Sequence, residues 1–219
     1  MTSADNSAES LPLINIAIAD DHELFRSGIC HIINSFTNCR VMLEATDGRN
    51  LLNKLSRSDI LPDICIIDLN MPVLNGYDTL EEIKKVIPQT KVLILTVHTE
   101  SFVLQKLASM GANGYVVKNI NPVQLNEAIR SVFKNGFYFY DPSKKKTVKQ
   151  TDIKESPAIN KGEMEFLKLC GKPISYEEIA TIMHVSTRTI HSYQYDLTNK
   201  LKVNNRFGLA LFAKDIGLA

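Results

Sequence analysis

The sequence predicts two domains: an α/β domain built on a doubly wound, five-stranded parallel sheet, and a smaller all-α domain of four helices. Three observations lead to this fold class. Short apolar runs alternate five times with segments of helical periodicity. Four of the apolar runs end directly on polar residues. Beyond residue 157 the strand patterns stop and helix-capping signals follow one another.

The predicted strands are apolar runs bounded by turn residues. They occupy residues 14–19, 40–44, 64–68, 92–95 and 115–117. The third run is unbroken up to Asp68, and Pro72 and Gly76 then force a turn, which is typical of a buried parallel strand. Because parallel strands are joined by right-handed crossovers, this alternation favours a doubly wound sheet.

A segment with apolar residues at helical spacing follows each run, and the fifth segment has the clearest helix signals. Asn121 is a predicted N-cap, Pro122 occupies the first helical position, and Gly136 follows the last apolar residue. The apolar positions of the five segments are Phe25, Ile29, Ile32, Ile33 and Phe36; Leu51, Leu52 and Leu55; Leu80, Ile83 and Ile87; Val103, Leu107 and Met110; and Leu125, Ala128, Ile129, Val132 and Phe133.

The C-terminal part has the pattern of a helix-turn-helix domain. Capping boxes are predicted where Asn160 precedes Glu163 and where Ser175 precedes Glu178, and Ser186 is the N-cap of a third helix. The short connection before Ser186 predicts two closely packed helices. The third helix would bury Ile190, Tyr193, Leu197 and Leu201, and a fourth helix would begin at Arg206.

Charge and periodicity predict the domain boundaries. Residues 1–140 carry 12 Lys and Arg against 15 Asp and Glu, a net charge of −3; residues 141–150 carry 4 against 1, or +3; residues 151–219 carry 9 against 8, or +1. We therefore expect a disordered lead at 1–12, the α/β domain at 13–140, a linker at 141–157 and the helical domain at 158–219. A lysine run in a linker is usually solvated chain, and contact with phosphates is the less common role.

Composition favours a cytoplasmic protein without membrane association. No apolar run approaches the ~20 residues of a membrane span, and the first ten residues lack the pattern of a signal peptide. The four cysteines show no CxxC or Cys/His spacing, which favours reduced thiols over disulfides or zinc.

Polar residues gather at the predicted carboxyl edge of the sheet. Asp20 and Asp21 follow the first strand, Asp68 ends the third, Thr96 follows the fourth and Lys118 follows the fifth. Open α/β folds bind ligands at this edge. Taken singly, each residue has a simpler role, as a helix cap, a strand end or a solvated tip. Their joint occurrence on one edge favours a site.

Neighbouring carboxylates repel one another unless a cation lies between them. Mg²⁺ suits this set because it accepts few carboxylates and bridges phosphate, whereas Ca²⁺ needs more oxygen ligands. Lys118 adds an ammonium, Thr96 a hydroxyl donor and Asp68 a nucleophilic carboxylate. These groups together are suited to receiving a phosphoryl group.

This constellation resembles the receiver domain of bacterial response regulators. The resemblance rests on the acid pair, Asp68 with Met71-Pro72 and Gly76, Thr96, and Lys118 with Tyr115 three residues before it. It implies a flavodoxin-like sheet with strand order 2-1-3-4-5. It also implies that Asp68 is the phospho-acceptor, that Asp21 and the Asn70 carbonyl join Asp68 on Mg²⁺ with Asp20 acting through water, and that Thr96 and Tyr115 form a switch pair.

Two positions near the site are individual to this chain, and a third departs from a common family residue. Asn70 and His98 occupy places that modulate phosphate lifetime in the family, and a metal-binding role for His98 is not expected. Asn119 stands where many receivers have proline after the lysine, so the sequence leaves the usual cis peptide bond open.

The segment from Ser186 to His191, with Lys200-Leu201 and the covering helix, resembles the DNA-binding domain of the NarL/LuxR family. The resemblance implies that the third helix enters the major groove. The expected DNA contacts are Arg188, His191, Ser192, Tyr195, Asn199 and Lys202. Departures from the family pattern are His191 in place of Lys, Tyr193 in place of His and Gly162 in place of Arg.

The sequence therefore predicts a two-component response regulator. A sensor histidine kinase would phosphorylate Asp68, and the change would draw Thr96 inward and let Tyr115 turn in. One domain of net charge +1 makes few phosphate contacts. A homodimer that forms on phosphorylation is therefore expected on double-stranded DNA, with recognition helices one DNA turn apart, about 34 Å.

Two alternatives remain open at this point. An aspartyl-phosphate hydrolase typically carries a second acid two residues after its nucleophile, where this chain has Asn70. A response regulator with a degenerate helical domain would act through protein contacts, and His191 and the low net charge are compatible with that. The expectation is a phosphoryl acceptor with at most slow self-dephosphorylation, not an enzyme.

Overall fold

The structure, a computed structural model, describes residues 12–97, 101–141, 146–148, 159–216 and 218. Most of the predicted N-terminal lead, much of the predicted linker and His98 lie outside the described residues.

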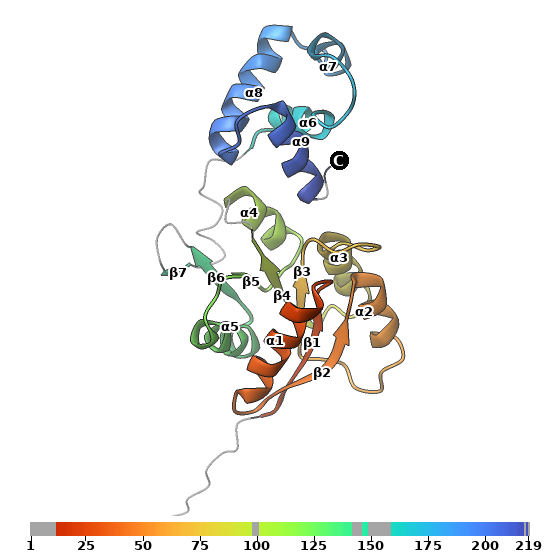
Figure 1. The fold of residues 1–219 in the computed structure, drawn as a ribbon, viewed down its shortest axis with the longest axis vertical. Coiled ribbons are helices and arrows are strands. Elements are labelled where there is room, and N and C mark those ends of the chain that lie inside the picture. Colours follow the sequence, from red (N-terminus) through yellow and green to blue (C-terminus); the bar gives the residue numbers. More distant parts are fainter. Residues whose placement is uncertain (1–11, 98–100, 142–145, 149–158, 217, 219) are drawn as a thin grey trace, which may run out of the picture.

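The five predicted strands form a parallel sheet (Figure 1). They are β1 (Ile14–Ala19), β2 (Cys39–Ala45), β3 (Ile64–Asp68), β4 (Lys91–Thr96) and β5 (Gly114–Val117). Their order is β2-β1-β3-β4-β5, which confirms the expected topology. The polar residues after β1, β3, β4 and β5 therefore meet at one edge.

Two further strands extend this sheet, and the sequence analysis did not predict them. β6 (Tyr138–Asp141) pairs parallel to β5, and β7 (Lys146–Val148) returns antiparallel to β6. β7 lies within the stretch assigned to the linker. The aromatic residues of β6 have high strand propensity, and pairing with the edge of β5 buries Tyr138 and Phe139.

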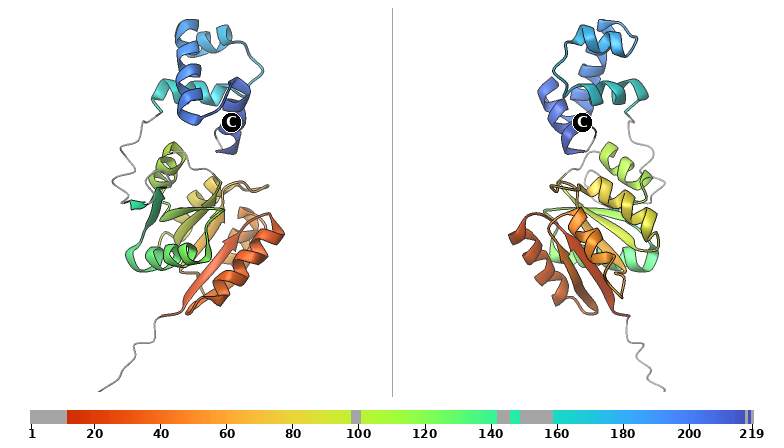
Figure 2. Two further views of the ribbon diagram at one scale, coloured as in Figure 1. Left: turned by 60° about the vertical axis from the view of Figure 1, so that its left-hand side comes forward. Right: turned by 90° about the vertical axis from the view of Figure 1, so that its right-hand side faces the viewer.

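Helices cover both faces of the sheet (Figures 1 and 2). α1 (Glu23–Ser35) and α5 (Pro122–Asn135) pack on one face, and α2 (Gly48–Leu55), α3 (Gly76–Val86) and α4 (Ser101–Ser109) pack on the other. Successive strand residues alternate between the two layers: Ile16 and Ile18 join the first, Ala17 and Ala19 the second. The core is therefore a three-layer sandwich with β1, β3 and β4 at its centre.

The capping predictions for α5 are confirmed. The Asn121 side chain accepts a hydrogen bond from the amide of Gln124, and Gly136 adopts the left-handed conformation that ends the helix. No cis peptide bond occurs among the described residues, so the bond between Lys118 and Asn119 is trans.

The C-terminal part is the predicted four-helix domain, with α6 (Lys161–Leu169), α7 (Tyr176–Ile182), α8 (Thr187–Leu201) and α9 (Arg206–Asp215). Both predicted capping boxes form, and Ser186 caps α8. The core side chains are Phe166, Leu167, Ile179, Ile190, Leu197, Leu201, Leu209, Phe212 and Ala213.

One charged pair also lies in this domain. Glu163 is 2% exposed, and both of its carboxylate oxygens accept hydrogen bonds from the Lys200 ammonium, at 2.8 and 2.7 Å. The pair joins the first turn of α6 to the last turn of α8, so it fixes α8 on the body of the domain.

Within the described part of the chain, no helix has the length and apolar character needed to span a membrane.

Candidate phosphoryl-acceptor site and candidate DNA interface

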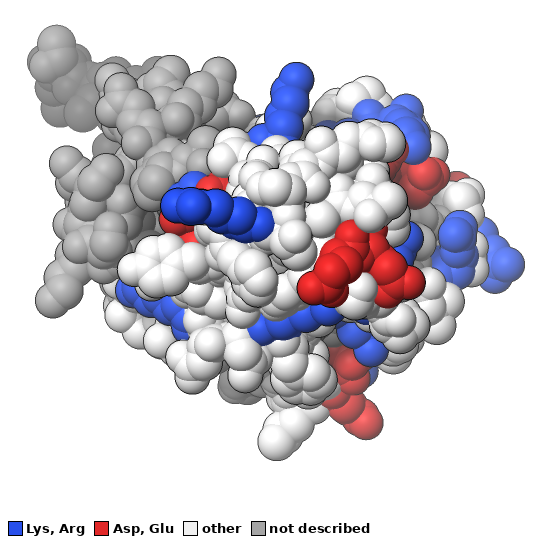
Figure 3. All heavy atoms as spheres, turned by 90° about the horizontal axis from the view of Figure 1, so that it is seen from above, with Lys and Arg blue, Asp and Glu red and all other residues white. Residues whose placement is uncertain are grey.

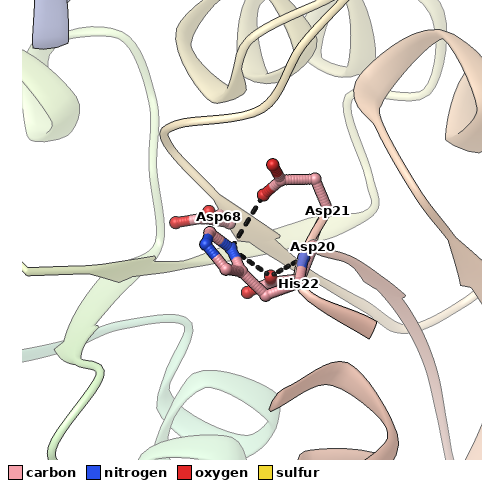
Figure 4. Close-up of side chains that lie close together, drawn as sticks. All are labelled: Asp20, Asp21, His22 and Asp68. Atoms are coloured by element: carbon pink, nitrogen blue, oxygen red, sulfur yellow. Dashed lines mark hydrogen bonds and ion pairs between the residues drawn. The ribbon is translucent and has the colours of Figure 1, made fainter. Parts of the chain in front are cut away.

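Two adjacent strands deliver the three carboxylates. Asp20 and Asp21 directly follow β1, and Asp68 is the last residue of β3. β1 and β3 are parallel neighbours with Ala19 paired to Ile67, so the acidic residues lie side by side (Figure 4). Asp20 is fully buried and Asp68 is 3% exposed, whereas Asp21 faces solvent.

The Lys118 ammonium lies between the two buried carboxylates. Its Nζ is 2.9 Å from Oδ2 of Asp20 and 2.9 Å from Oδ2 of Asp68. β5 beside β4 places the lysine there, and the Lys118 amide donates to the carbonyl of Thr96 at 2.8 Å. Burial by itself lowers the pKa of Lys118, but its hydrogen bonds to Asp68 and Asp20 outweigh burial and raise it. The lysine is therefore charged at neutral pH.

Burial raises the pKa of the Asp68 carboxyl, although Lys118 and the backbone amide of Asn70 oppose the shift and the neighbouring Asp20 adds to it. The cluster of three carboxylates and one ammonium lacks positive charge. A divalent cation with oxygen ligands matches this deficit. The residues present therefore fit Mg²⁺.

His22 is a member of the cluster that the sequence analysis missed. Its Nδ1 lies 2.9 Å from an oxygen of Asp21 and 3.3 Å from an oxygen of Asp20 (Figure 4). Ligand atoms of His22 and the three aspartates all lie within 4.8 Å of one another. The signal available in the sequence was its position directly after the acid pair.

Two features hold the loops around the carboxylates in place. Arg26 donates to the carbonyl of Asp20 at 2.7 Å and lies 3.5 Å from Glu44, so α1 is tied to the loop after β1. Gly76, at the start of α3, approaches β3 so closely that a Cβ there would lie 2.3 Å from the carbonyl oxygen of Asp68. The glycine predicted to make the turn thus also permits a close backbone approach.

The remaining predicted site residues lie around this cluster. Thr96 is the last residue of β4 and is 1% exposed, and the Asn70 side chain faces solvent. Tyr115 is also 1% exposed, and its hydroxyl donates to the carbonyl of Tyr140 on β6. In this conformation the Tyr115 ring is enclosed beside β6, and its proposed movement on phosphorylation stays a prediction.

All six predicted DNA contacts are exposed in the structure, while Ile190, Leu197 and Leu201 on the other side of α8 are buried. Lys202 differs from its predicted position on the helix, because it ends α8 in the left-handed conformation (φ 54°). The His191 ring packs edge-on against the Tyr176 ring of α7, with 5.1 Å between the ring centroids.

Charges on the helical domain are mixed in sign. The face seen in Figure 3 carries Lys and Arg side chains interspersed with Asp and Glu among the described residues. This distribution matches the net charge of +1 for residues 151–219. Phosphate attraction from a single copy is therefore limited.

Comparisons with known proteins match both parts of the chain. Residues 16–130 match the family model for the response regulator receiver domain, and residues 160–213 match the model for bacterial regulatory proteins of the luxR family. The chain is 30% identical over 211 residues to the response regulator UvrY of Escherichia coli K12, covering 94% of this chain and 96% of that protein.

A second relative and a solved structure have the same extent. The response regulator protein VraR of Staphylococcus epidermidis is 27% identical, covering 91% of this chain and 96% of that protein. RcsB from Salmonella enterica serovar Typhimurium, bound to promoter rprA in the presence of the phosphomimetic BeF3−, superposes with a TM-score of 0.69 at 26% identity, covering 93% of this chain and 99% of that one.

Proposed function

Because the chain belongs to the bacterial response regulators that join a receiver domain to a luxR-type DNA-binding domain, we propose that Asp68 accepts a phosphoryl group from a sensor histidine kinase and that this controls DNA binding through α8. The observation that carries the proposal is the Lys118 ammonium, held 2.9 Å from both Asp20 and Asp68 at the carboxyl edge of the sheet.

In the proposed reaction an Asp68 carboxylate oxygen attacks phosphorus and the donor leaves from the opposite side. The product is an acyl phosphate on Asp68. Lys118 transfers one of its hydrogen bonds from the Asp68 carboxylate to a phosphoryl oxygen, and the Thr96 hydroxyl donates to another. Both donors are nearly enclosed, at 17% exposure for the Lys118 side chain and 1% for Thr96, so water competes little with them.

Asp20, Asp21, Asp68 and the Asn70 carbonyl are the proposed residues for Mg²⁺, with Asp20 acting through water. Bound there, Mg²⁺ supplies positive charge that offsets phosphoryl oxygens and carboxylates in one place. The raised pKa of Asp68 supports this assignment, because it indicates a buried acid with too little compensating charge.

The proposed output surface consists of Arg188, His191, Ser192, Tyr195, Asn199 and Lys202. Their joint exposure opposite the buried face of α8 supports major-groove binding. The solved RcsB complex with promoter DNA, in a protein of similar fold, supports the same assignment. A homodimer is part of the proposal, since a second helix one DNA turn away multiplies weak phosphate contacts.

We propose that the chain is a phosphoryl acceptor with at most slow self-dephosphorylation, and that Thr96 and Tyr115 report the state of Asp68. For the helical domain we keep the expected boundaries of 158–219. For the first domain we propose an extension of the expected 13–140 to residue 148, which is supported by the pairing of β6 and β7 with the sheet.

Acetyl phosphate with Mg²⁺ tests the acceptor. Intact mass should rise by one phosphoryl group in the wild type and not in Asp68→Ala, and chelation of Mg²⁺ should abolish the gain. Equal modification of both proteins would contradict the proposal. Steady turnover of a generic phosphate ester would instead indicate an aspartyl-phosphate hydrolase.

Proposed DNA binding through α8 is tested with a gel-shift assay at fixed salt. The assay uses the DNA upstream of the protein's own gene, with and without beryllofluoride. Beryllofluoride should strengthen binding, and Arg188→Ala should weaken it because a major-groove contact is lost. The same lack of binding in every state of the wild type would favour an output domain that acts through protein contacts.

A further inference from the structure

We propose that Phe25 is a positioning residue for phosphoryl transfer, whose ring holds the Lys118 ammonium in place while the lysine exchanges its partners. This inference rests on the proposed phosphorylation of Asp68. The Lys118 Nζ lies 4.9 Å from the centroid of the Phe25 ring. That distance is within the range of an attractive cation–π contact.

The ammonium has three hydrogens, and the structure accounts for the direction of two of them. One faces Asp20 and another faces Asp68, each across 2.9 Å. Phe25 lies in the first turn of α1, where α1 packs beside the loop that follows β1. The ammonium is thus held by carboxylates together with the face of an aromatic ring.

A ring has properties that a third carboxylate would lack in this position. Its attraction acts on a cation over the ring face within about 6 Å of the centroid, so the contact at 4.9 Å persists when the ammonium moves a few tenths of an ångström toward a phosphoryl oxygen. It carries no net charge and therefore does not repel an incoming dianion. It also accepts no strong hydrogen bond, which leaves the lysine free to donate to the phosphoryl group.

The setting makes this contact stronger than one at the protein surface. The Lys118 side chain is 17% exposed, and Phe25 is half-buried against the cluster that contains Ile29 and Ile33. Cation–π attraction increases when water is excluded from the cation. From the sequence, Phe25 was assigned to the apolar face of α1, and its ring also serves the site.

The test compares variants of the full-length protein with the wild type by beryllofluoride binding in the presence of Mg²⁺. Phe25→Leu keeps an apolar side chain and removes the ring, and we expect about a threefold to tenfold weaker affinity, the range that a partly desolvated cation–π contact supports. Phe25→Tyr and Phe25→Trp keep an aromatic face and should bind as the wild type does.

Phe36→Leu is the matched control. Phe36 is also half-buried against the same cluster, but it follows the other end of α1, about 16 Å along the helix from Phe25. Its replacement removes an equal amount of ring and should leave beryllofluoride affinity unchanged. Unfolding temperature, measured for all variants, separates loss of packing from loss of binding.

NMR chemical shifts detect the contact between Lys118 and Phe25 in the unphosphorylated protein. The Lys118 Hε protons should resonate upfield in the wild type because of the Phe25 ring current, and this shift should disappear in Phe25→Leu. If that variant is too unstable, Phe25→Met provides the same comparison.

Different results would contradict the acceptor function of Asp68 and the positioning role of Phe25. If wild type and Asp68→Asn bind beryllofluoride equally, the proposed acceptor function is overturned, whatever Phe25 does. If the wild type binds and Phe25→Leu matches Phe25→Tyr in affinity, or if the Lys118 shift is the same in both, Phe25 has no positioning role while the acceptor function stands.

Discussion

At the scale of single residues, the buried carboxylate of Asp68 lowers the stability of the folded protein at neutral pH. Its carboxyl is almost completely buried, and burial raises its pKa above the usual value of 3.8 despite the neighbouring ammonium. The native state therefore binds a proton at this position more tightly than the unfolded chain does. Protonated Asp68 contributes stability that is complete below pH 3.8 and is lost as the pH rises through the raised pKa.

Asp68→Asn should therefore unfold at a higher temperature than the wild type at neutral pH. It should also lose the part of the pH dependence that begins just above 3.8, because an amide does not titrate. Thermal melts from acidic to neutral pH without Mg²⁺ give both quantities. Asp59→Asn removes an exposed carboxylate from another part of the receiver and is the control, so it should leave the melting temperature at neutral pH close to that of the wild type. A lower melting temperature for Asp68→Asn at neutral pH would contradict this account.

Two departures from the luxR-family pattern are explained by one contact. A Cβ on Gly162 would lie 2.3 Å from the hydroxyl oxygen of Tyr193, so the tyrosine occupies the space above the glycine. The two residues lie on α6 and α8, which pack together. Gly162 and Tyr193 are therefore a matched pair, and neither is independent of the other.

Gly162→Ala should destabilise the protein by ~1–3 kcal/mol through overpacking. The sign of this change in unfolding free energy distinguishes overpacking from helix propensity, because alanine in a helix interior otherwise stabilises by up to ~1 kcal/mol relative to glycine. Gly28 on α1 has open space around its Cβ position, so Gly28→Ala should show that ordinary gain. Tyr193→Phe in the Gly162→Ala background should recover part of the loss in denaturant unfolding. Stabilisation by Gly162→Ala alone would rule out the contact.

At the scale of elements, the strands and helices that build the receiver were predictable because each carries a strong local signal. The run into Asp68 is unbroken, and α5 has both its N-cap Asn121 and its terminal Gly136. β6 and β7 were missed because their short segments flank a lysine-rich stretch, and composition there outweighed strand propensity. Pairing with the free edge of β5 decides their conformation, and a neighbour of this kind is not visible in a local pattern.

The site was predictable to the same extent. A parallel sheet brings strand ends together whatever the side chains are, so Asp20, Asp68 and Lys118 could be placed on one edge. The contributions of His22 and Phe25 depend on how the first turn of α1 meets that edge. Helical periodicity identified the buried face of α1 but not what its first residues touch.

Tyr115 links the proposed switch to the unpredicted strand. Since its hydroxyl donates to the carbonyl of Tyr140, Tyr115→Phe should weaken the pairing of β6 with β5. We expect hydrogen exchange at residues 138–141 to become faster by a factor that corresponds to ~0.5–1.5 kcal/mol, the net worth of one hydrogen bond. Tyr77→Phe, which removes a hydroxyl from α3, is the control and should leave these amides unchanged. Equal exchange in Tyr115→Phe and wild type would show that backbone pairing and packing hold β6 without this hydrogen bond.

At the scale of the whole molecule, Lys106 connects the two domains. Its Nζ donates to the carbonyl of Ile216, which ends α9, at 2.9 Å and lies 4.3 Å from the centre of the Tyr77 ring on α3. The carbonyls at a helix C-terminus have no partner within the helix and carry partial negative charge, so an ammonium from α4 satisfies one of them.

Lys106→Met should loosen this connection, because it keeps the length of the side chain and removes the charge. The expected results are a larger radius of gyration in X-ray scattering and a loss of ~0.5–1.5 kcal/mol of contact free energy. Lys54→Met, on α2 and bonded to the carbonyl of Glu44 within the receiver, is the control and should leave the radius unchanged. An unchanged radius for Lys106→Met would mean that the contact does not hold the domains together.

The hydrogen bond from Lys106 to Ile216 also implies that binding at the two domains is coupled. α4 follows the strand that ends at Thr96, so any ligand that favours one arrangement of α4 changes the strength of the contact between α4 and α9. Equilibrium coupling between two binding events is reciprocal and equal in both directions. If an acyl phosphate on Asp68 increases the affinity of the helical domain for its operator, operator binding must favour the acyl-phosphate form by the same equilibrium factor. Protein bound at a promoter would therefore stay phosphorylated to a greater extent than free protein.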